Sequence, residues 1–313
     1  MSSLNYHNMP KVDILMATYN GGAYIRAQLN SLISQSFTDW HLIIHDDGST
    51  DNTVDIIRQY TIDPRIDLIE DNVVCGGAAK NFLYLTRFSN APFCMFCDQD
   101  DIWFDNKVEM LYQAIENEQI DTPVAVYGRS YLWIPDKGIA GITGWSSFPY
   151  KLEQLICSNA GIQGCSAICN RAALQYLRNY NGRIAMHDHL LNIAVLTFGQ
   201  AIPVATPLML YRQHLGNVTG ASPDSLSLWK RLWRSFCYAH PVIDRKHYDA
   251  IFDFYHNYKK DMTINIQKIF KAYLAMPNYS YIQKISTVIH YRLSRKNSII
   301  HLVAKILFHP YIN

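Results

Sequence analysis

Short apolar segments alternate with amphipathic segments along the first part of the chain. The apolar runs of strand length are residues 12–17, 40–45, 66–69 and 93–97. Amphipathic segments separate them; in the first, Ile25, Leu29 and Leu32 fall on one face of a helix. Strands that alternate with helices through short connections predict a mostly parallel sheet covered by helices on both faces.

The alternation becomes less regular after residue 123. Further strands are expected at residues 124–127, 131–134, 161–170, 201–205 and 208–211. A loop rich in Gly, Ser and Pro is expected over residues 138–149, and helices over residues 171–177 and 190–196. We expect these strands to form a mixed extension of the parallel sheet.

From residue 226 onward the sequence is helical in pattern, basic and aromatic. Residues 229–234 and 291–305 combine Lys and Arg with large apolar side chains at helical spacing. Two interpretations remain open: adhesion to an anionic membrane surface, or packing on the preceding domain with a solvated basic face. We therefore expect an α/β domain over residues 1–222 and a helical extension over residues 223–313.

Composition narrows the function classes. The chain is 49% hydrophobic and 17% charged, and its net charge of +2 gives no electrostatic reason to expect a nucleic-acid partner. The seven Cys are irregularly spaced and are expected to be reduced thiols. Residues 1–10 have no signal-peptide core, and no run reaches ~20 apolar residues, so a cytoplasmic chain without a membrane-spanning helix is expected.

Polar turns follow three of the predicted strands, at residues 18–20, 46–51 and 98–101. Ligands of parallel α/β sheets bind outside the carboxyl ends of the strands. The third turn holds Asp98, Asp100 and Asp101, and buried unpaired carboxylates are costly enough to call for a cation such as Mg²⁺ or Mn²⁺. The alternative for this turn is an acidic surface loop that caps the next helix. Neither a dinucleotide-binding G-x-G-x-x-G nor a P-loop is present, which argues against an oxidoreductase or a P-loop NTPase.

Seven short segments in order resemble family 2 glycosyltransferases with the GT-A fold. The segments are residues 16–21, 46–51, 77–82, 97–103, 164–165, 187–188 and 211–214. The similarity spans residues ~11 to ~220 and is greatest to the bacterial branch that builds O-antigen, capsule or rhamnose-rich polysaccharides. It implies a GT-A fold, a Rossmann-like α/β sheet flanked by helices, and the helical tail carries no matching segment.

The resemblance also implies how a nucleotide-sugar donor would bind. Tyr19 would stack on a pyrimidine base, and either Asp46 or Asp47 would accept from the base N3–H, as uracil or thymine requires. Lys80 would neutralise the diphosphate. The implied donor-binding residues are Thr18, Tyr19, Asn20, Asp46, Asp47, Lys80, Asp98, Gln99 and Arg212.

For the metal, the resemblance implies Mn²⁺ or Mg²⁺ at Asp98 and Asp100, with His214 as a further ligand. Asp101 is interpreted as a helix cap. Asp188 matches the family's catalytic base, which takes the acceptor hydroxyl proton in an inverting transfer; a simple helix cap is the alternative for it.

On the acceptor side, Trp103, Gly164 and Cys165 are candidate contacts. The resemblance implies a UDP- or dTDP-sugar donor, a polyprenyl-diphosphate-linked glycan acceptor, and action at the cytoplasmic face of the bacterial membrane. Two other functions remain in view: a non-catalytic sugar-nucleotide-binding scaffold at the membrane, and a D-x-D phosphatase. The strand end Thr18-Tyr19-Asn20 lacks the nucleophilic Asp that a phosphatase needs.

Overall fold

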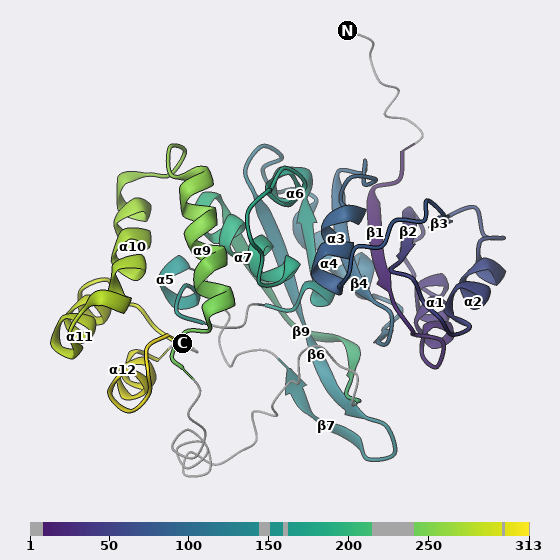
Figure 1. Ribbon diagram of the computed structural model, residues 1–313. Coiled ribbons are helices and arrows are strands. Elements are labelled where there is room, and N and C mark those ends of the chain that lie inside the picture. Colours follow the sequence, from purple (N-terminus) through teal and green to yellow (C-terminus); the bar gives the residue numbers. More distant parts are fainter. Residues whose placement is uncertain (1–8, 144–150, 159–161, 215–240, 296–297, 313) are drawn as a thin grey trace, which may run out of the picture.

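A nine-stranded sheet forms the centre of the molecule (Figure 1). The computed structural model describes residues 9–143, 151–158, 162–214, 241–295 and 298–312. Its strands are β1 (Val12–Thr18), β2 (Trp40–Asp46), β3 (Ile66–Ile69), β4 (Phe93–Asp98), β5 (Ile102–Trp103), β6 (Val124–Ile134), β7 (Gly138–Thr143), β8 (Ala167–Asn170) and β9 (Gln200–Arg212).

The strand order is β3-β2-β1-β4-β8-β6-β9-β5, with β7 paired to β6. The first four strands of this order pair in parallel. Beyond β4 the sheet is mixed: β8 is antiparallel to both β4 and β6, whereas β6 and β9 are parallel. The predicted α/β class, with a parallel half and a mixed extension, is therefore confirmed.

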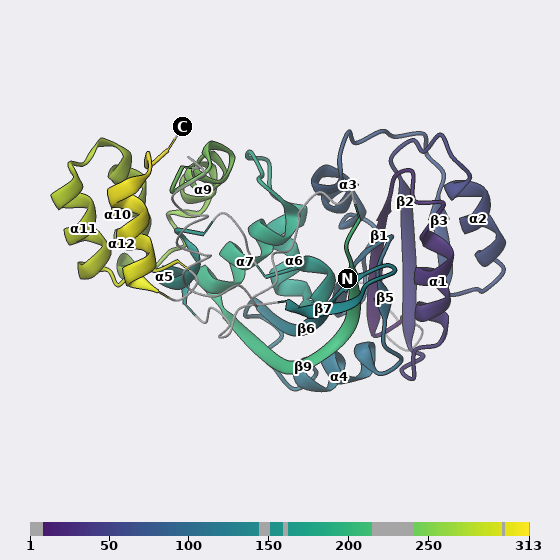
Figure 2. The same ribbon diagram turned by 90° about the horizontal axis from the view of Figure 1, so that it is seen from below.

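Helices cover both faces of the sheet (Figure 2). They are α1 (Ile25–Ile33), α2 (Thr53–Tyr60), α3 (Ala78–Leu85), α4 (Lys107–Ile115), α5 (Leu152–Leu155), α6 (Arg171–Arg178), α7 (His187–Phe198), α9 (Arg245–Tyr258), α10 (Ile264–Ala275), α11 (Tyr281–His290) and α12 (Ile299–Phe308). Short 3₁₀ turns lie at Gly164–Ser166 and Met276–Asn278.

Two hydrophobic cores lie on opposite faces of the sheet because successive side chains of a strand alternate. Leu15 and Phe96 pack with α3, α6 and α7, whereas Met16 and Met95 pack with α1, α2 and α4. The same alternation puts Cys94 and Cys97 in different cores. All six cysteines in the described part of the chain are free thiols.

The mixed half of the sheet is more regular than the sequence pattern indicates. β6 and β9 are each one long strand where two short ones were expected, and the interruptions appear as register shifts in the pairing of Tyr127, Arg129 and Tyr131 with β9. Part of the expected loop over residues 138–149 is strand β7, which pairs with β6 after a tight turn at Asp136 and Gly138. Both turn residues have positive φ, which reverses the chain within a few residues.

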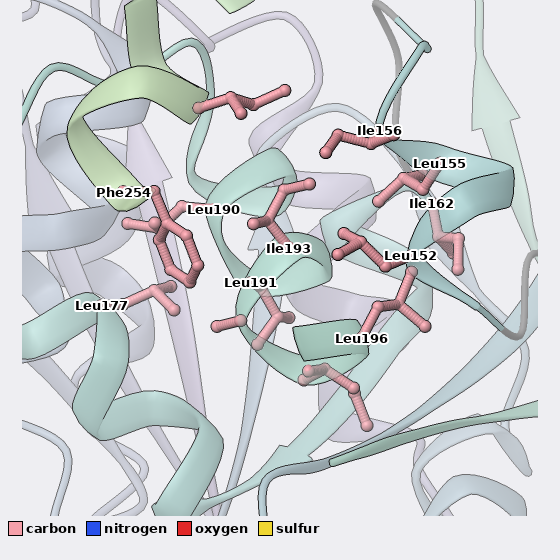
Figure 3. Close-up of a cluster of buried hydrophobic side chains, with 14 of the residues drawn as sticks. Leu152, Leu155, Ile156, Ile162, Leu177, Leu190, Leu191, Ile193, Leu196 and Phe254 are labelled. Atoms are coloured by element: carbon pink, nitrogen blue, oxygen red, sulfur yellow. The ribbon is translucent and has the colours of Figure 1, made fainter. Parts of the chain in front are cut away.

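The helices α9 to α12 lie at the end of the molecule opposite to α2 and β3 (Figures 1 and 2). They share one core with the sheet, and Figure 3 shows Phe254 of α9 beside Leu177 of α6 and Leu190 of α7. The expected domain boundary at residues 222–223 and the basic segment 229–234 lie outside the described residues. In the part of the chain that the structure describes, no helix combines the length and the apolar character needed to span a bilayer.

Candidate active site

Three polar turns meet at the carboxyl ends of β1, β2 and β4, as the sequence predicts. Thr18 Oγ1 donates to Asp46 Oδ2 at 2.7 Å, which joins the first turn to the second. The Gln99 side chain pairs with both backbone groups of Tyr19, each bond 2.9 Å long, which joins the first turn to the third. The parallel registers of β1 with β2 and β4 bring these strand ends together.

The first turn leaves one aromatic ring free. Asn20 has a φ of 47°, in the left-handed region that Asn tolerates. Its backbone N–H donates to Ser49 Oγ at 2.7 Å, and its side-chain oxygen accepts from the Thr50 N–H at 2.8 Å. Tyr19, held on both sides, remains 55% exposed and offers a flat face at the rim of the site.

Donors of the first two turns occupy the acceptor positions of the Asp46 carboxylate. It accepts from Thr18 Oγ1, from the Gly48 N–H at 3.1 Å, and from both the N–H and the hydroxyl of Ser49 at 2.7 Å. A carboxylate offers about four acceptor positions, so Asp46 has none left for a ligand. Its observed role is to shape the turn after β2.

The neighbouring Asp47 holds the glycine turn before α3. It is 7% exposed and accepts from the backbone N–H groups of Cys75, Gly76 and Gly77. Three donors leave the carboxylate about one free acceptor position. Lys80 lies on the first turn of α3, is exposed, and forms no ion pair with any described residue.

In the acidic turn after β4, Asp101 is buried and Asp98 and Asp100 are half-buried. Donor atoms of Asp98, Asp101 and Cys165 lie within 4.8 Å of one another. Burial, and then the charge of Asp100, raise the pKa of Asp98 to about 7. Burial also raises the pKa of Asp101 well above its usual range, and Asp101 Oδ2 has no hydrogen-bond partner among the described residues.

The end of β9 closes over this turn. His214 Nε2 lies 2.7 Å from Asp100 Oδ2, and its ring stacks on Tyr24 with centroids 4.5 Å apart. The Arg212 N–H donates to Asp101 Oδ1 at 3.1 Å, and its Nε donates to the Asp100 carbonyl at 2.7 Å. Arg212 is 8% exposed, so its observed contacts hold the acidic turn rather than reach outward to a donor.

Two expectations about this region are wrong. Asp101 does not cap the next helix, because α4 begins at Lys107 with Asn106 as its N-cap. Trp103 is 2% exposed and its ring lies 3.5 Å beneath the Lys107 ammonium, so it has no free face for a sugar. Both side chains belong to the floor of the site.

The sequence analysis missed Lys107. This lysine is fully buried, and its ammonium donates to the Cys165 carbonyl at 2.6 Å. Burial lowers its pKa to about 8, whereas the charges of Asp101 and Asp98 act in the opposite direction. A sequence signal exists, because Lys107 shares a helix face with the buried Leu111 and Ile115.

Asp188 lies in the first turn of α7, separate in sequence from the acidic turn. Its Oδ1 accepts from the His189 N–H at 2.7 Å, and its Oδ2 lies 3.4 Å from the Gly164 nitrogen. Burial raises the pKa of Asp188 to about 6, although these N–H groups oppose the rise. The N-cap of α7 is Met186, so Asp188 is not a simple cap.

Gly164 supports this carboxylate by its lack of a side chain. A Cβ there would lie 2.7 Å from His187 Nε2 and 3.1 Å from Asp188 Cβ, so no other residue fits without displacement. Gly164 and Cys165 are both buried, which corrects the expectation that they contact an acceptor. Cys165 instead contributes its carbonyl to Lys107 and its thiol to the Asp98–Asp101 cluster.

The acidic turn fits a hard divalent cation. Asp98, Asp100 and Asp101 offer oxygen ligands, His214 adds an imidazole nitrogen, and the unpartnered Oδ2 of Asp101 lacks a compensating contact. The Cys165 thiol is a poor ligand, because burial holds its pKa well above its usual range and keeps it protonated. The oxygen-rich donor set is that expected for Mg²⁺ or Mn²⁺.

Comparisons with known proteins identify the family to which this sequence is similar. The sequence profile described as Glycosyl transferase family 2 matches residues 13–177. The dTDP-rhamnosyl transferase RfbG of Shigella flexneri is 31% identical over 234 residues, which cover 69% of this chain and 78% of that protein.

A second relative is WfgD of Escherichia coli, named UDP-Glc:alpha-D-GlcNAc-diphosphoundecaprenol beta-1,3-glucosyltransferase. It is 35% identical over 158 residues, which cover 50% of this chain and 57% of that protein. The crystal structure of S. aureus TarS 1-349 in complex with UDP-GlcNAc superposes with a TM-score of 0.58 and 16% identity over 90% of this chain and 80% of that chain. The last similarity concerns the fold alone.

Proposed function

This chain belongs to glycosyl transferase family 2 and is a glycosyltransferase, and we propose that it transfers a sugar with inversion from a UDP- or dTDP-sugar in a metal-dependent reaction. The observation that carries the proposal is the separation of two kinds of carboxylate. Asp98, Asp100 and Asp101 lie together in the turn after β4, whereas Asp188 lies in the first turn of α7 with a pKa of about 6. An inverting transfer needs one base on the acceptor side and charge compensation on the donor side.

The nucleoside would bind at the rim formed by β1 and β2. Tyr19 is exposed and suits stacking on a pyrimidine. Of the two aspartates that the sequence offers, Asp47 is favoured as the acceptor for the base N3–H, because it retains one acceptor position and Asp46 does not. Thr18 would act by holding the Asp46 carboxylate, and the exposed Lys80 would neutralise the diphosphate.

The diphosphate would bind against the acidic turn through a divalent cation held by Asp98, Asp100, Asp101 and His214. When bound, this cation would supply positive charge opposite the leaving diphosphate. The buried Lys107 offsets part of the negative charge of the carboxylates from below. Arg212 and Gln99 keep the turn in place through its backbone and through Tyr19.

Asp188 would act on the acceptor. As the acceptor oxygen forms its bond to the anomeric carbon, its proton passes to an Asp188 carboxylate oxygen, and the bond to the diphosphate oxygen breaks with its electron pair. A base with a pKa near 6 is deprotonated at neutral pH and is still basic enough to help. Gly164 and the His189 N–H fix the orientation of this carboxylate.

The acceptor is proposed to be a lipid-linked glycan used in surface polysaccharide synthesis. The printed name of WfgD includes a diphosphoundecaprenol acceptor, which supports this class. The enzyme would then work at the cytoplasmic face of the membrane, with the helical extension against the lipid surface. A non-catalytic scaffold would have no use for a buried carboxylate of raised pKa at Asp188, so this alternative is not favoured.

The test is a panel of nucleotide sugars assayed with a lipid-linked acceptor for Mn²⁺-dependent release of UDP or dTDP. We expect release with one or a few donors, and its loss in Asp100→Ala. The exposed Asp105, which follows the same turn, provides the matched control Asp105→Ala. Absence of turnover with every donor would contradict the proposal, and equal turnover with and without the metal would contradict its metal dependence.

A further inference from the structure

A groove of about 700 Å³ lies between residues of the short helix α5 and residues of α10, α11 and α12. Figure 1 shows where these helices lie. No residue of the candidate active site lines it. Its volume falls within the range of small-ligand sites. The lining residues are Lys151, Glu153, Gln154, Asn265, Lys268, Ile269, His290, Tyr291, Arg292, Ser294 and Ile299.

The charge of this groove is predominantly positive. Lys151, Lys268 and Arg292 each carry a permanent charge, and Glu153 is the sole carboxylate in the lining. Among the described residues, none of the three cations lies within ion-pair distance of a carboxylate, although most other arginines in the described helices and turns are paired or bonded. Three unpaired cations around one hollow attract an anion.

The backbone at Arg292 is a second and independent indication. Arg292 has a φ of 51° and follows α11. Its N–H donates to the Ile289 carbonyl at 3.2 Å, and the Leu293 N–H donates to the Val288 carbonyl at 2.9 Å, which is the hydrogen-bond pattern of a Schellman C-cap. Glycine is the residue that this left-handed position favours, and arginine is unfavourable there. The side chain that lines the groove is therefore present against the local backbone preference.

Exposed apolar side chains lie on the same two helices that border the groove. On α11, Ile282 is 81% exposed and Ile289 is 61% exposed, and on α12, Ile300 is 83% exposed and Leu307 is 49% exposed. Each pair is separated by seven residues and so lies on one face of its helix. Figures 1 and 2 show α11 and α12 side by side at the outer end of the molecule. Exposed apolar side chains on helices that also border a basic groove match the two layers of a lipid surface, acyl chains and phosphate.

We propose that this groove binds the phosphate headgroup of an anionic bilayer lipid, and that Arg292, Lys268 and Lys151 contact the phosphate. The apolar faces of α11 and α12 enter the adjoining acyl region. Gln154, Asn265 and Ser294 supply further hydrogen-bonding groups in the lining. The inference deepens the proposed membrane association of the extension and rests on it, but it does not depend on which sugar is transferred.

The experiment is flotation of the full-length protein with vesicles of phosphatidylcholine alone or of phosphatidylcholine with phosphatidylglycerol. We expect binding to the anionic vesicles only, and about fivefold weaker binding for Arg292→Gly or Lys268→Gln, the effect typical of one cation near such a surface. Lys259→Gln is the matched control, because Lys259 is exposed on the same helical extension and does not line the groove. Arg292→Gly relieves the backbone, so its melting temperature is expected to remain equal or to rise.

Equal binding of Arg292→Gly, Lys268→Gln and the wild-type protein would overturn the groove assignment, as would absence of wild-type binding to anionic vesicles. Equal weakening by Lys259→Gln would overturn it in favour of diffuse charge. Binding of inorganic pyrophosphate to the protein, together with equal binding of the protein to anionic and neutral vesicles, would overturn the lipid assignment. Donor turnover by the same variants, measured with the acceptor in detergent, distinguishes these failures from failure of the proposed enzyme activity, because turnover is expected to be unchanged.

Discussion

The strand-end site and the helical extension use charge in opposite ways. At the strand ends Asp101 is buried and Asp98 and Asp188 are half-buried, and backbone N–H groups donate to Asp101 and Asp188. In the extension, cations such as Lys268 and Arg292 are exposed. Burial strongly shifts the pKa of a charged group, and its charge acts on the few atoms next to it. Exposed charges are screened by salt and act together over a surface. The first arrangement is suited to chemistry and the second to adhesion.

The helical extension nevertheless packs against the segment that carries the proposed base, Asp188. Arg183, a few residues before α7, forms ion pairs with Asp253 at 2.8 Å and Asp249 at 2.9 Å on α9. Phe254 of the same helix packs in the core beside Leu190 (Figure 3). The segment that carries Asp188 is therefore supported by the extension, and a separation of the two regions would disturb the site.

The largest effect is expected from Asp188→Asn. The change keeps the size of the side chain and removes its basicity, so turnover should fall by about 10²- to 10⁴-fold, the usual contribution of a general base. Initial rates of UDP or dTDP release with saturating donor and acceptor provide the measurement. Undiminished turnover would show that α7 does not carry the base.

The next largest effect is expected from a substitution in the core that the helical extension shares with the sheet. Phe254→Ala removes a ring that is 1% exposed and should lower the free energy of unfolding by about 3–5 kcal/mol. Because the core is continuous, we expect one shifted transition in denaturant unfolding. Phe252→Ala, on the same helix but 39% exposed, is the control with a small expected change. Two separate transitions, of which only one responds, would show that the extension is an independent unit.

A smaller effect is expected at the nucleoside rim. Asp47→Asn replaces one acceptor position by an amide donor, and should weaken UDP binding by about tenfold or more, the value of a hydrogen bond to a charged group. CDP has no N3–H, so its binding should not weaken in parallel, and the preference for UDP over CDP should fall. An equal loss for both nucleotides would assign Asp47 to the glycine turn alone. Asp55→Asn on the exposed face of α2 is the matched control.

The smallest effect is expected from a change of pH rather than from a substitution. The base acts only when deprotonated, and the pKa of Asp188 is raised to about 6. At saturating Mn²⁺, kcat/KM should be constant above pH 7 and fall about tenfold per unit well below pH 6. A profile that stays flat to about pH 4, the usual range of an exposed Asp, would contradict the burial of this carboxylate.

The sequence predicts the parts of the site that depend on local pattern. The sequence predicts that the turns after β1, β2 and β4 lie close together, because the carboxyl ends of parallel strands share one edge of a sheet. The sequence could not predict which of Asp46 and Asp47 accepts from the base N3–H. That choice depends on which backbone N–H groups donate to each carboxylate.

Long-range packing explains the remaining errors. Lys107 is buried because the Cys165 carbonyl, 58 residues away in the chain, accepts from its ammonium. Trp103 is covered by the same lysine, and the need for glycine at position 164 arises from the His187 ring. The burial of Lys107 has a local signal only in the helix face that it shares with Leu111 and Ile115. The contacts of Trp103 and Gly164 have no signal in the nearby sequence, and the same holds for the groove beside α5.

The most direct test of the division between donor-side and acceptor-side carboxylates is a titration of UDP and dTDP in the presence of Mn²⁺. It compares the wild-type protein with Asp188→Asn and Asp100→Ala. The account predicts that Asp188→Asn binds its preferred nucleotide within about twofold of wild type, although its turnover falls by about 10²- to 10⁴-fold, and that Asp100→Ala loses the metal-dependent part of binding. Loss of nucleotide binding in Asp188→Asn, or unchanged metal-dependent binding in Asp100→Ala, would contradict it.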